Sequence, residues 1–262
     1  MNIVELPGAA LHYREDGAPD GAPIVFANSL GCDLRLWDAV VARLPAGLCV
    51  IRYDKRGHGL SSCPPPPYSM GALVSDAEAL LDHLQVRGAV FVGLSIGGMI
   101  AQGLAVKRMD QIRAMVISNT AAKIGTKEMW DERIAAVRNG GVEALADAIM
   151  ERWFSKSFRA TPELALWRNM LVRQPTEGYI GCSAAIAGTD FYTTTASLTL
   201  PTLAIAGSED GSTPPDLVRE TADLVKGSRF ELIRGAGHIP CVEKPREYAE
   251  ILTAFLKDIG HV

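Results

Sequence analysis

The chain has 262 residues, of which 48% are hydrophobic and 21% charged, a composition typical of a globular protein with a large core. The formal net charge is −4 and no run of Lys and Arg occurs, which argues against nucleic acid as a partner. The five cysteines are scattered and form no Cys-x-x-Cys pair, so the sequence predicts neither a disulfide framework nor a zinc site.

The beginning of the chain shows no targeting segment. Residues 1–20 contain several charged side chains and no apolar stretch of the kind found in signal peptides. No apolar run approaches the ~20 residues that a membrane-spanning helix needs. We therefore expect a cytoplasmic protein with no membrane partner, and the sequence leaves a homo-oligomer open.

Strands and helices alternate through the first part of the chain. Apolar runs predict strands over Asn2 to Leu6, Leu11 to Glu15, Ala22 to Ala27, Leu48 to Tyr53, Ala89 to Val92 and Ala114 to Ser118, the first two as a hairpin. Helical spacing predicts helices over 33–43, Met70 to Gln85 and Met99 to Val106. This alternation is typical of a parallel sheet with right-handed crossovers.

From about Ala121 the pattern changes to helices alone. They are predicted over Thr126 to Arg138, Val142 to Phe154, Pro162 to Val172 and Thr176 to Ala187. Strands resume at Thr202 to Ala206 and Arg229 to Ile233, followed by helices over Pro215 to Val225 and Pro245 to Ile259. Because the helical insertion has no sheet of its own, we expect 121–196 to form a cap over a core made of 1–120 and 197–262.

A Gly-x-Ser-x-Gly motif lies between the strand at Ala89 to Val92 and the helix that begins at Met99. Ser95 is at its centre, flanked by Gly93 and Gly97. In a strand–turn–helix context this motif is a nucleophile elbow, in which a tight turn holds the hydroxyl clear of the sheet. The glycines allow the helix and strand to approach closely. A chance match is the alternative, but the flanking pattern favours a catalytic serine.

A serine hydroxyl needs a base and a group that orients the base. After a nucleophile elbow the expected order is Ser, an acid, then His. His238 lies beyond Ser95 in the chain, in a loop after the predicted strand at Arg229 to Ile233, and directly follows Gly237. Asp210 follows the strand at Thr202 to Ala206 and is favoured over Glu209 as the acid, with an Asx turn before Gly211 as the non-catalytic alternative.

The reaction also needs donors for the oxyanion that forms on the attacked carbonyl. One is expected to be the N–H of Ile96, the residue after the nucleophile. The other should come from the loop after the strand at Ala22 to Ala27, where the N–H of Leu30 is favoured and that of Ser29 is the alternative.

These residues together resemble the α/β-hydrolase superfamily over nearly the whole chain. The resemblance implies a mostly parallel, eight-stranded sheet flanked by helices, with an inserted helical cap. The segment from Tyr53 to Gly59 is similar to one that usually follows the fourth strand there. The chain departs from many members in having Asn28-Ser29 where they have His-Gly. The oxyanion donors expected in that loop are backbone N–H groups, so the loop should still function.

A narrower resemblance is to the 3-oxoadipate enol-lactonases of the β-ketoadipate pathway. It is carried by Asn28 to Gly31, by Asn119 to Thr126, and by Glu151 to Phe154 in the cap. It implies that Ser95 opens a small anionic lactone to 3-oxoadipate through an acyl-enzyme, with no metal and no cofactor.

Because that substrate carries a carboxylate, the pocket should hold a cation. Trp130 and Arg133 are three residues apart on a predicted helix and therefore share a face. Arg133 is expected to bind the carboxylate, with Trp130 and Trp153 as pocket walls. A solvated Arg133 and a Trp130 that only anchors the cap are the alternatives.

Other functions on the same scaffold are a carboxylesterase or a C–C-bond hydrolase acting on another small ester or diketone. A ligand receptor built on a hydrolase fold is the non-enzyme alternative. A receptor of this kind often loses residues of the catalytic triad, whereas all three candidates are present here.

Overall fold

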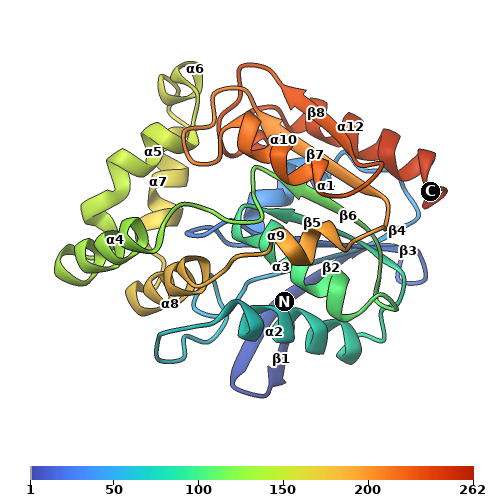
Figure 1. The fold of residues 1–262 in the computed structure, drawn as a ribbon, viewed down its shortest axis with the longest axis horizontal. Coiled ribbons are helices and arrows are strands. Elements are labelled where there is room, and N and C mark those ends of the chain that lie inside the picture. The colour runs from blue at the N-terminus through green and yellow to red at the C-terminus, as the bar shows by residue number, and fades with distance from the viewer. Residues whose placement is uncertain (1) are drawn as a thin grey trace.

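The apolar runs of the sequence assemble into one eight-stranded sheet in the computed structural model, which describes residues 2–262 (Figure 1). The strands are β1 (Asn2–Leu6), β2 (Ala9–Gly17), β3 (Ala22–Ala27), β4 (Leu48–Tyr53), β5 (Ala89–Leu94), β6 (Ile112–Ser118), β7 (Thr202–Gly207) and β8 (Arg229–Ile233). Their order is β1-β2-β4-β3-β5-β6-β7-β8, and pairing is parallel from β4 to β8. The expected mostly parallel sheet is confirmed.

Two antiparallel strands extend the parallel part of the sheet at one edge. β1 pairs with β2, with Leu6 opposite Ala9, and β2 pairs with β4. The central strand β5 is buried at all six positions because helices cover both faces of a parallel sheet. Its carboxyl end, which leads to Ser95, therefore lies between β3 and β6 in a fully packed environment.

One group of helices lies outside the segment between β6 and β7 and packs on the sheet. These helices are α1 (Asp38–Val41), α2 (Met70–His83), α3 (Ile96–Lys107), α10 (Pro215–Asp223), α11 (Pro240–Glu243) and α12 (Pro245–Asp258). α2 contacts α3, and α1 contacts α12, so the sheet lies between helical layers. None of the described helices is long and apolar enough to cross a membrane.

The segment between β6 and β7 contains helices and no strand in the described chain. They are α4 (Lys127–Gly140), the 3-10 helix η2 (Val142–Leu145), α5 (Ala146–Trp153), α6 (Lys156–Arg159), α7 (Leu164–Val172), α8 (Thr176–Ala187) and α9 (Tyr192–Ala196). α4 to α8 gather at one end of the molecule, at the left of Figure 1. α4 begins after Thr126, whose side chain accepts a hydrogen bond from the Met129 N–H, and it packs against α8.

Two predicted helices were wrong in part. The region 33–43 forms the 3-10 helix η1 (Leu34–Trp37), which the Asp33 side chain caps, followed by the short α1. The Leu34 N–H donates to Asp54 at 2.7 Å and the Arg35 N–H to Asp33 at 3.0 Å.

The region Val142 to Phe154 was predicted as one helix and is divided between η2 and α5. Its apolar residues Val142 and Leu145 are three apart, the spacing that a 3-10 turn places on one side. The short helices α6, α9 and α11 were not predicted, since four or five residues are too few to show a helical period.

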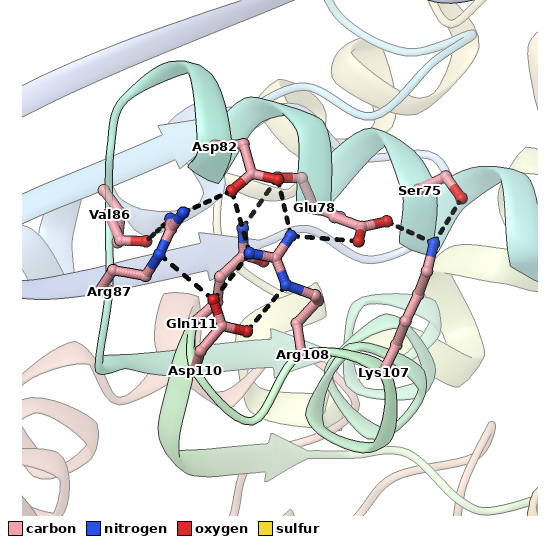
Figure 2. A network of polar contacts seen from close by, with 9 residues as sticks. All are labelled: Ser75, Glu78, Asp82, Val86, Arg87, Lys107, Arg108, Asp110 and Gln111. Atoms are coloured by element: carbon pink, nitrogen blue, oxygen red, sulfur yellow. Dashed lines mark hydrogen bonds and ion pairs between the residues drawn. The ribbon is translucent and has the colours of Figure 1, made fainter.

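A surface network ties α2 to the end of α3 (Figure 2). The Arg108 guanidinium contacts Asp82 at 2.6 Å, Asp110 at 2.8 Å and Glu78 at 3.2 Å. Lys107 pairs with the same Glu78. These groups are partly exposed, so the network contributes modestly to stability and links α2 to the carboxyl end of α3, away from Ser95.

Candidate active site

Ser95 occupies a strained turn between β5 and α3. Its φ is 57° and its ψ is −118°, a conformation that side-chain-bearing residues rarely adopt. The turn closes only because its flanking glycines have no side chain. A Cβ on Gly93 would lie 2.1 Å from the Gly97 carbonyl oxygen, and a Cβ on Gly97 would lie 2.3 Å from the Ala27 carbonyl oxygen. The sequence therefore dictates this geometry through the spacing of its glycines.

His238 and Asp210 come from loops after β8 and β7 and meet at the same edge of the sheet as Ser95. The His238 Nδ1 and an Asp210 carboxylate oxygen are 2.9 Å apart, and both residues are buried. Within residues 2–262 the carboxylate that forms an ion pair with His238 is that of Asp210, and Glu209, the less favoured candidate, forms none with it. A carboxylate on Nδ1 leaves Nε2 as the nitrogen that can act as a base.

Asp210 is surrounded by hydrogen-bond donors. One of its oxygens accepts from the side chains of Asn119 at 2.9 Å and Thr213 at 2.8 Å, and the other from the Ser212 N–H at 2.7 Å. Burial alone would raise the pKa of Asp210, but the charge of His238 and the hydrogen bonds from His238, Asn119 and the Ser212 N–H outweigh it, so the pKa lies below its usual value. The carboxylate is therefore kept ionised beside the imidazole.

The loop that carries His238 is fixed by its backbone to the helical segment between β6 and β7. The His238 N–H donates to the Trp153 carbonyl oxygen at 2.8 Å. The Glu243 carboxylate accepts from the Gly237 N–H at 2.6 Å and from the Ser155 N–H at 3.2 Å. The position of the imidazole thus depends on contacts between segments that are distant in the sequence.

Ser95 and His238 line one cavity of about 110 Å³, which lies between the sheet edge and the helices after β6. Its walls also include the predicted residues Leu30, Trp130, Arg133 and Trp153. A larger surface hollow of about 630 Å³ near α2, α3 and α8 contains none of these residues, so its size does not bear on the chemistry. The volume of the cavity that contains Ser95 suits a small substrate.

The two predicted oxyanion donors come from separate segments, the start of α3 and the loop after β3. Ile96 is the first residue of α3, and Leu30 is in the cavity wall beside Ser29. Within residues 2–262 neither the Leu30 N–H nor the Ile96 N–H has a hydrogen-bond acceptor. Free backbone donors at a helix start are suited to an anionic oxygen.

Two guanidinium groups line the cavity, of which only Arg133 was predicted. Arg133 lies over the Trp130 ring at 5.1 Å from its centroid, which orients it by a cation–π contact. Arg152 is the second, on α5. In the described part of the chain neither forms an ion pair with a carboxylate. Burial and the charge of Arg133 lower the pKa of Arg152, as expected for neighbouring cations that lack a counter-ion.

The aromatic residues have two functions in the cavity. Trp130 is 3% exposed and donates its indole N–H to the Ile124 carbonyl oxygen at 2.7 Å, so it anchors α4 as well as forming a wall. Trp153 stacks on His238, with ring centroids 6.5 Å apart. Tyr179, which was not predicted as a site residue, completes the wall near the two arginines. Burial raises the pKa of Tyr179 above its usual value, and the charges of Arg133 and Arg152 offset only part of this rise.

Sequence reasoning missed several residues of this site, among them Asn119, Arg152 and Tyr179. Asn119 was identifiable in principle, because it follows β6 at the sheet edge where β5 delivers Ser95. Its φ of 45° is a conformation that asparagine tolerates better than most residues. Arg152 lies in a segment that carried the narrower resemblance, but the sequence assigned no role to Arg152 or Tyr179, since only the packing of the helices between β6 and β7 brings them to Arg133.

Comparison with known proteins identifies the family of the chain. A family model described as the alpha/beta hydrolase family matches residues 24–251. The chain is 35% identical to 3-oxoadipate enol-lactonase 2 of Acinetobacter baylyi, over 95% of this chain and 93% of that protein.

Solved structures show the same similarity. The enol-lactonase from Burkholderia xenovorans LB400 has a TM-score of 0.94 at 36% identity, covering 98% of this chain and all of that one. A thermophilic esterase from Thermogutta terrifontis has a TM-score of 0.93 at 28% identity, with both chains fully covered. From its sheet, its elbow and these matches, the chain belongs to the α/β-hydrolase family.

Proposed function

We propose that this protein is a serine hydrolase that opens 3-oxoadipate enol-lactone to 3-oxoadipate, with residues 121–196 as the cap over the site. The observation that carries the proposal is one small cavity lined by Ser95, by His238, whose Nδ1 contacts Asp210, and by two guanidinium groups without a carboxylate partner among the described residues. The similarity to enol-lactonases over nearly the whole chain supports the same substrate.

The chemistry follows from the roles of these groups. His238 takes the proton of the Ser95 hydroxyl as its oxygen attacks the lactone carbonyl, and Asp210 stabilises the imidazolium that forms. The N–H groups of Leu30 and Ile96 bind the oxyanion. When the tetrahedral intermediate collapses, the ring C–O bond breaks and His238 returns the proton to the enol oxygen. Water activated by His238 then hydrolyses the acyl-enzyme, and the freed enol converts to the ketone, which disfavours reclosure.

The cavity also selects the substrate by charge. A carboxylate can accept two parallel hydrogen bonds from one guanidinium, which Lys cannot offer. Arg133 and Arg152 are therefore assigned to the free carboxylate of the lactone, and the walls formed by Trp130 and Trp153 to its apolar face.

A carboxylesterase is the second candidate, favoured by the similarity to the Thermogutta terrifontis esterase. A receptor without activity is disfavoured, because the acid, base and nucleophile candidates all lie at one sheet edge. The deciding experiment is turnover of the enol-lactone, followed as loss of its ultraviolet absorbance, beside neutral esters of similar size. We expect a strong preference for the lactone over the neutral esters. Ser95→Ala should abolish turnover of the lactone. Equal or better turnover of neutral esters would favour the esterase, and full activity of Ser95→Ala would remove the assignment of the nucleophile.

A further inference from the structure

Lys55, directly after β4, is a buried cation with no part in the mechanism described above. It is 2% exposed, and no carboxylate pairs with it within residues 2–262. Its Nζ instead donates to two backbone carbonyl oxygens, that of Ser29 at 2.6 Å and that of Cys32 at 3.4 Å. A buried amine that is satisfied by carbonyl groups of one short loop indicates a role in holding that loop.

The loop from Ser29 to Cys32 is a tight turn that carries the oxyanion donor. The Cys32 N–H donates to the Ser29 carbonyl oxygen at 3.2 Å, and Gly31 has a φ of +80°, as the third residue of a type II turn requires. The Gly31 N–H donates to Nε2 of His58 at 2.9 Å. Burial, and then the charge of Lys55, place the pKa of His58 well below its usual value, so this nitrogen remains an acceptor.

The peptide unit between Ser29 and Leu30 transmits the effect of Lys55 to the reaction. A trans peptide is planar, so its C=O and N–H point in opposite directions. When Lys55 holds the Ser29 carbonyl oxygen, the Leu30 N–H must point the other way. Ser29 and Leu30 both line the cavity with Ser95. We propose that Lys55 is a positioning residue that aims the Leu30 N–H at the oxyanion, an inference that rests on the proposed acyl transfer at Ser95.

The same contact strengthens the donor as well as aiming it. A hydrogen bond to a carbonyl oxygen draws electron density from the peptide and makes its N–H a better donor. The benefit is largest when the substrate carbonyl becomes an oxyanion, which happens only in the transition state. Lys55 should therefore affect kcat and the binding of transition-state analogues, and affect ground-state binding little.

The test compares Lys55→Met, Lys55→Arg and a control, Lys107→Met, which removes an amine from the surface network of Figure 2. Hydrolysis of p-nitrophenyl acetate is the assay, with Ser95→Ala as the inactive reference. Removing a direct oxyanion donor typically costs ~100- to 1000-fold in rate, so the loss of its positioning partner should lower kcat about 10- to 100-fold. KM should change less than about threefold, Lys55→Arg should restore part of kcat, and Lys107→Met should match the wild type.

A second readout separates positioning from general damage. A trifluoromethyl ketone that adds to Ser95 places an oxyanion in the same donors, so its inhibition constant should rise with Lys55→Met by the same factor as kcat falls. The inhibition constant of adipate, which resembles the product, should stay unchanged. Weakening of both inhibitors together, or a folded Lys55→Met with wild-type kcat, would overturn the proposal.

Folding of each variant is checked by thermal unfolding. If Lys55→Met does not fold, Lys55→Gln is compared with Lys55→Arg instead. The charged variant, Lys55→Arg, should then bind the trifluoromethyl ketone more tightly and have the higher kcat. Equal values in these two would contradict it. Because the ester assay does not use the lactone, failure of the enol-lactone substrate leaves this comparison intact. Activity in Ser95→Ala, by contrast, identifies failure of the proposed function itself.

Discussion

Removal of the cavity arginines gives a quantitative test of substrate recognition. Neither Arg133 nor Arg152 has a carboxylate partner in the described structure, so each is available to an anionic substrate. A hydrogen bond to a charged group contributes about 1.5–3 kcal/mol, which corresponds to roughly 10- to 150-fold in kcat/KM. We therefore expect Arg133→Gln and Arg152→Gln each to lower kcat/KM for the enol-lactone by a factor in this range.

The loss should fall mainly on KM, because a carboxylate remote from the reacting carbonyl is bound equally in the ground and transition states. The two variants should also be non-additive. Arg133 lowers the pKa of Arg152 by repulsion, so the removal of one guanidinium relieves the other in the free enzyme. The double variant should therefore lose a different amount of free energy from the sum of the two single losses.

The assay is the loss of ultraviolet absorbance of the enol-lactone, with p-nitrophenyl acetate as the uncharged substrate. Hydrolysis of the ester should be unchanged in both variants. Arg138→Gln is the matched control, since Arg138 is an exposed residue on the same helix as Arg133 and lies outside the cavity. The reasoning is refuted if KM for the lactone does not change, or if the neutral ester loses as much activity as the lactone.

Three further predictions concern the triad and the elbow. Asn119→Ala removes a donor to the Asp210 carboxylate and should lower kcat about tenfold or more at nearly constant KM, as measured by steady-state kinetics; an unchanged kcat would show that the donor is dispensable. Asp210→Asn should lower kcat by about 10⁴-fold because the histidine tautomer is no longer fixed. Because the pKa of Asp210 is lower in the folded chain, its ionised form stabilises the fold above about pH 4 and that stability is lost as pH falls through the folded pKa. Acid denaturation of Asp210→Asn, followed by circular dichroism, should therefore show a smaller loss of stability below pH ~4 than the wild type, and parallel curves would contradict this sign. Gly97→Ala would place a Cβ 2.3 Å from the Ala27 carbonyl oxygen and should destabilise the fold by more than ~2 kcal/mol in urea, whereas Gly71→Ala, on an open face of α2, should be neutral or stabilising by up to ~1 kcal/mol.

The sequence by itself determined the features that depend on local order along the chain. Alternating apolar and helical runs predicted the parallel sheet, and the interruption of that alternation predicted the helical segment between β6 and β7. The spacing of Gly93 and Gly97 around Ser95 dictates the elbow, because no other residue type fits those two positions. Chain order after the elbow was sufficient to favour Asp210 and His238, since parallel strands deliver their carboxyl ends to one edge.

Tertiary structure decided what depends on packing between distant segments. Arg152 joins Arg133 only because α4 and α5 fold over the same cavity, and Asn119 reaches Asp210 across 91 positions of sequence. In the sequence Lys55 is one charged residue in a polar loop. In the fold it is buried, and its Nζ donates to the carbonyl oxygen of Ser29. Periodicity reports which face of an element is buried, whereas the direction of a single side chain and its partner are set by the contacts that close the fold.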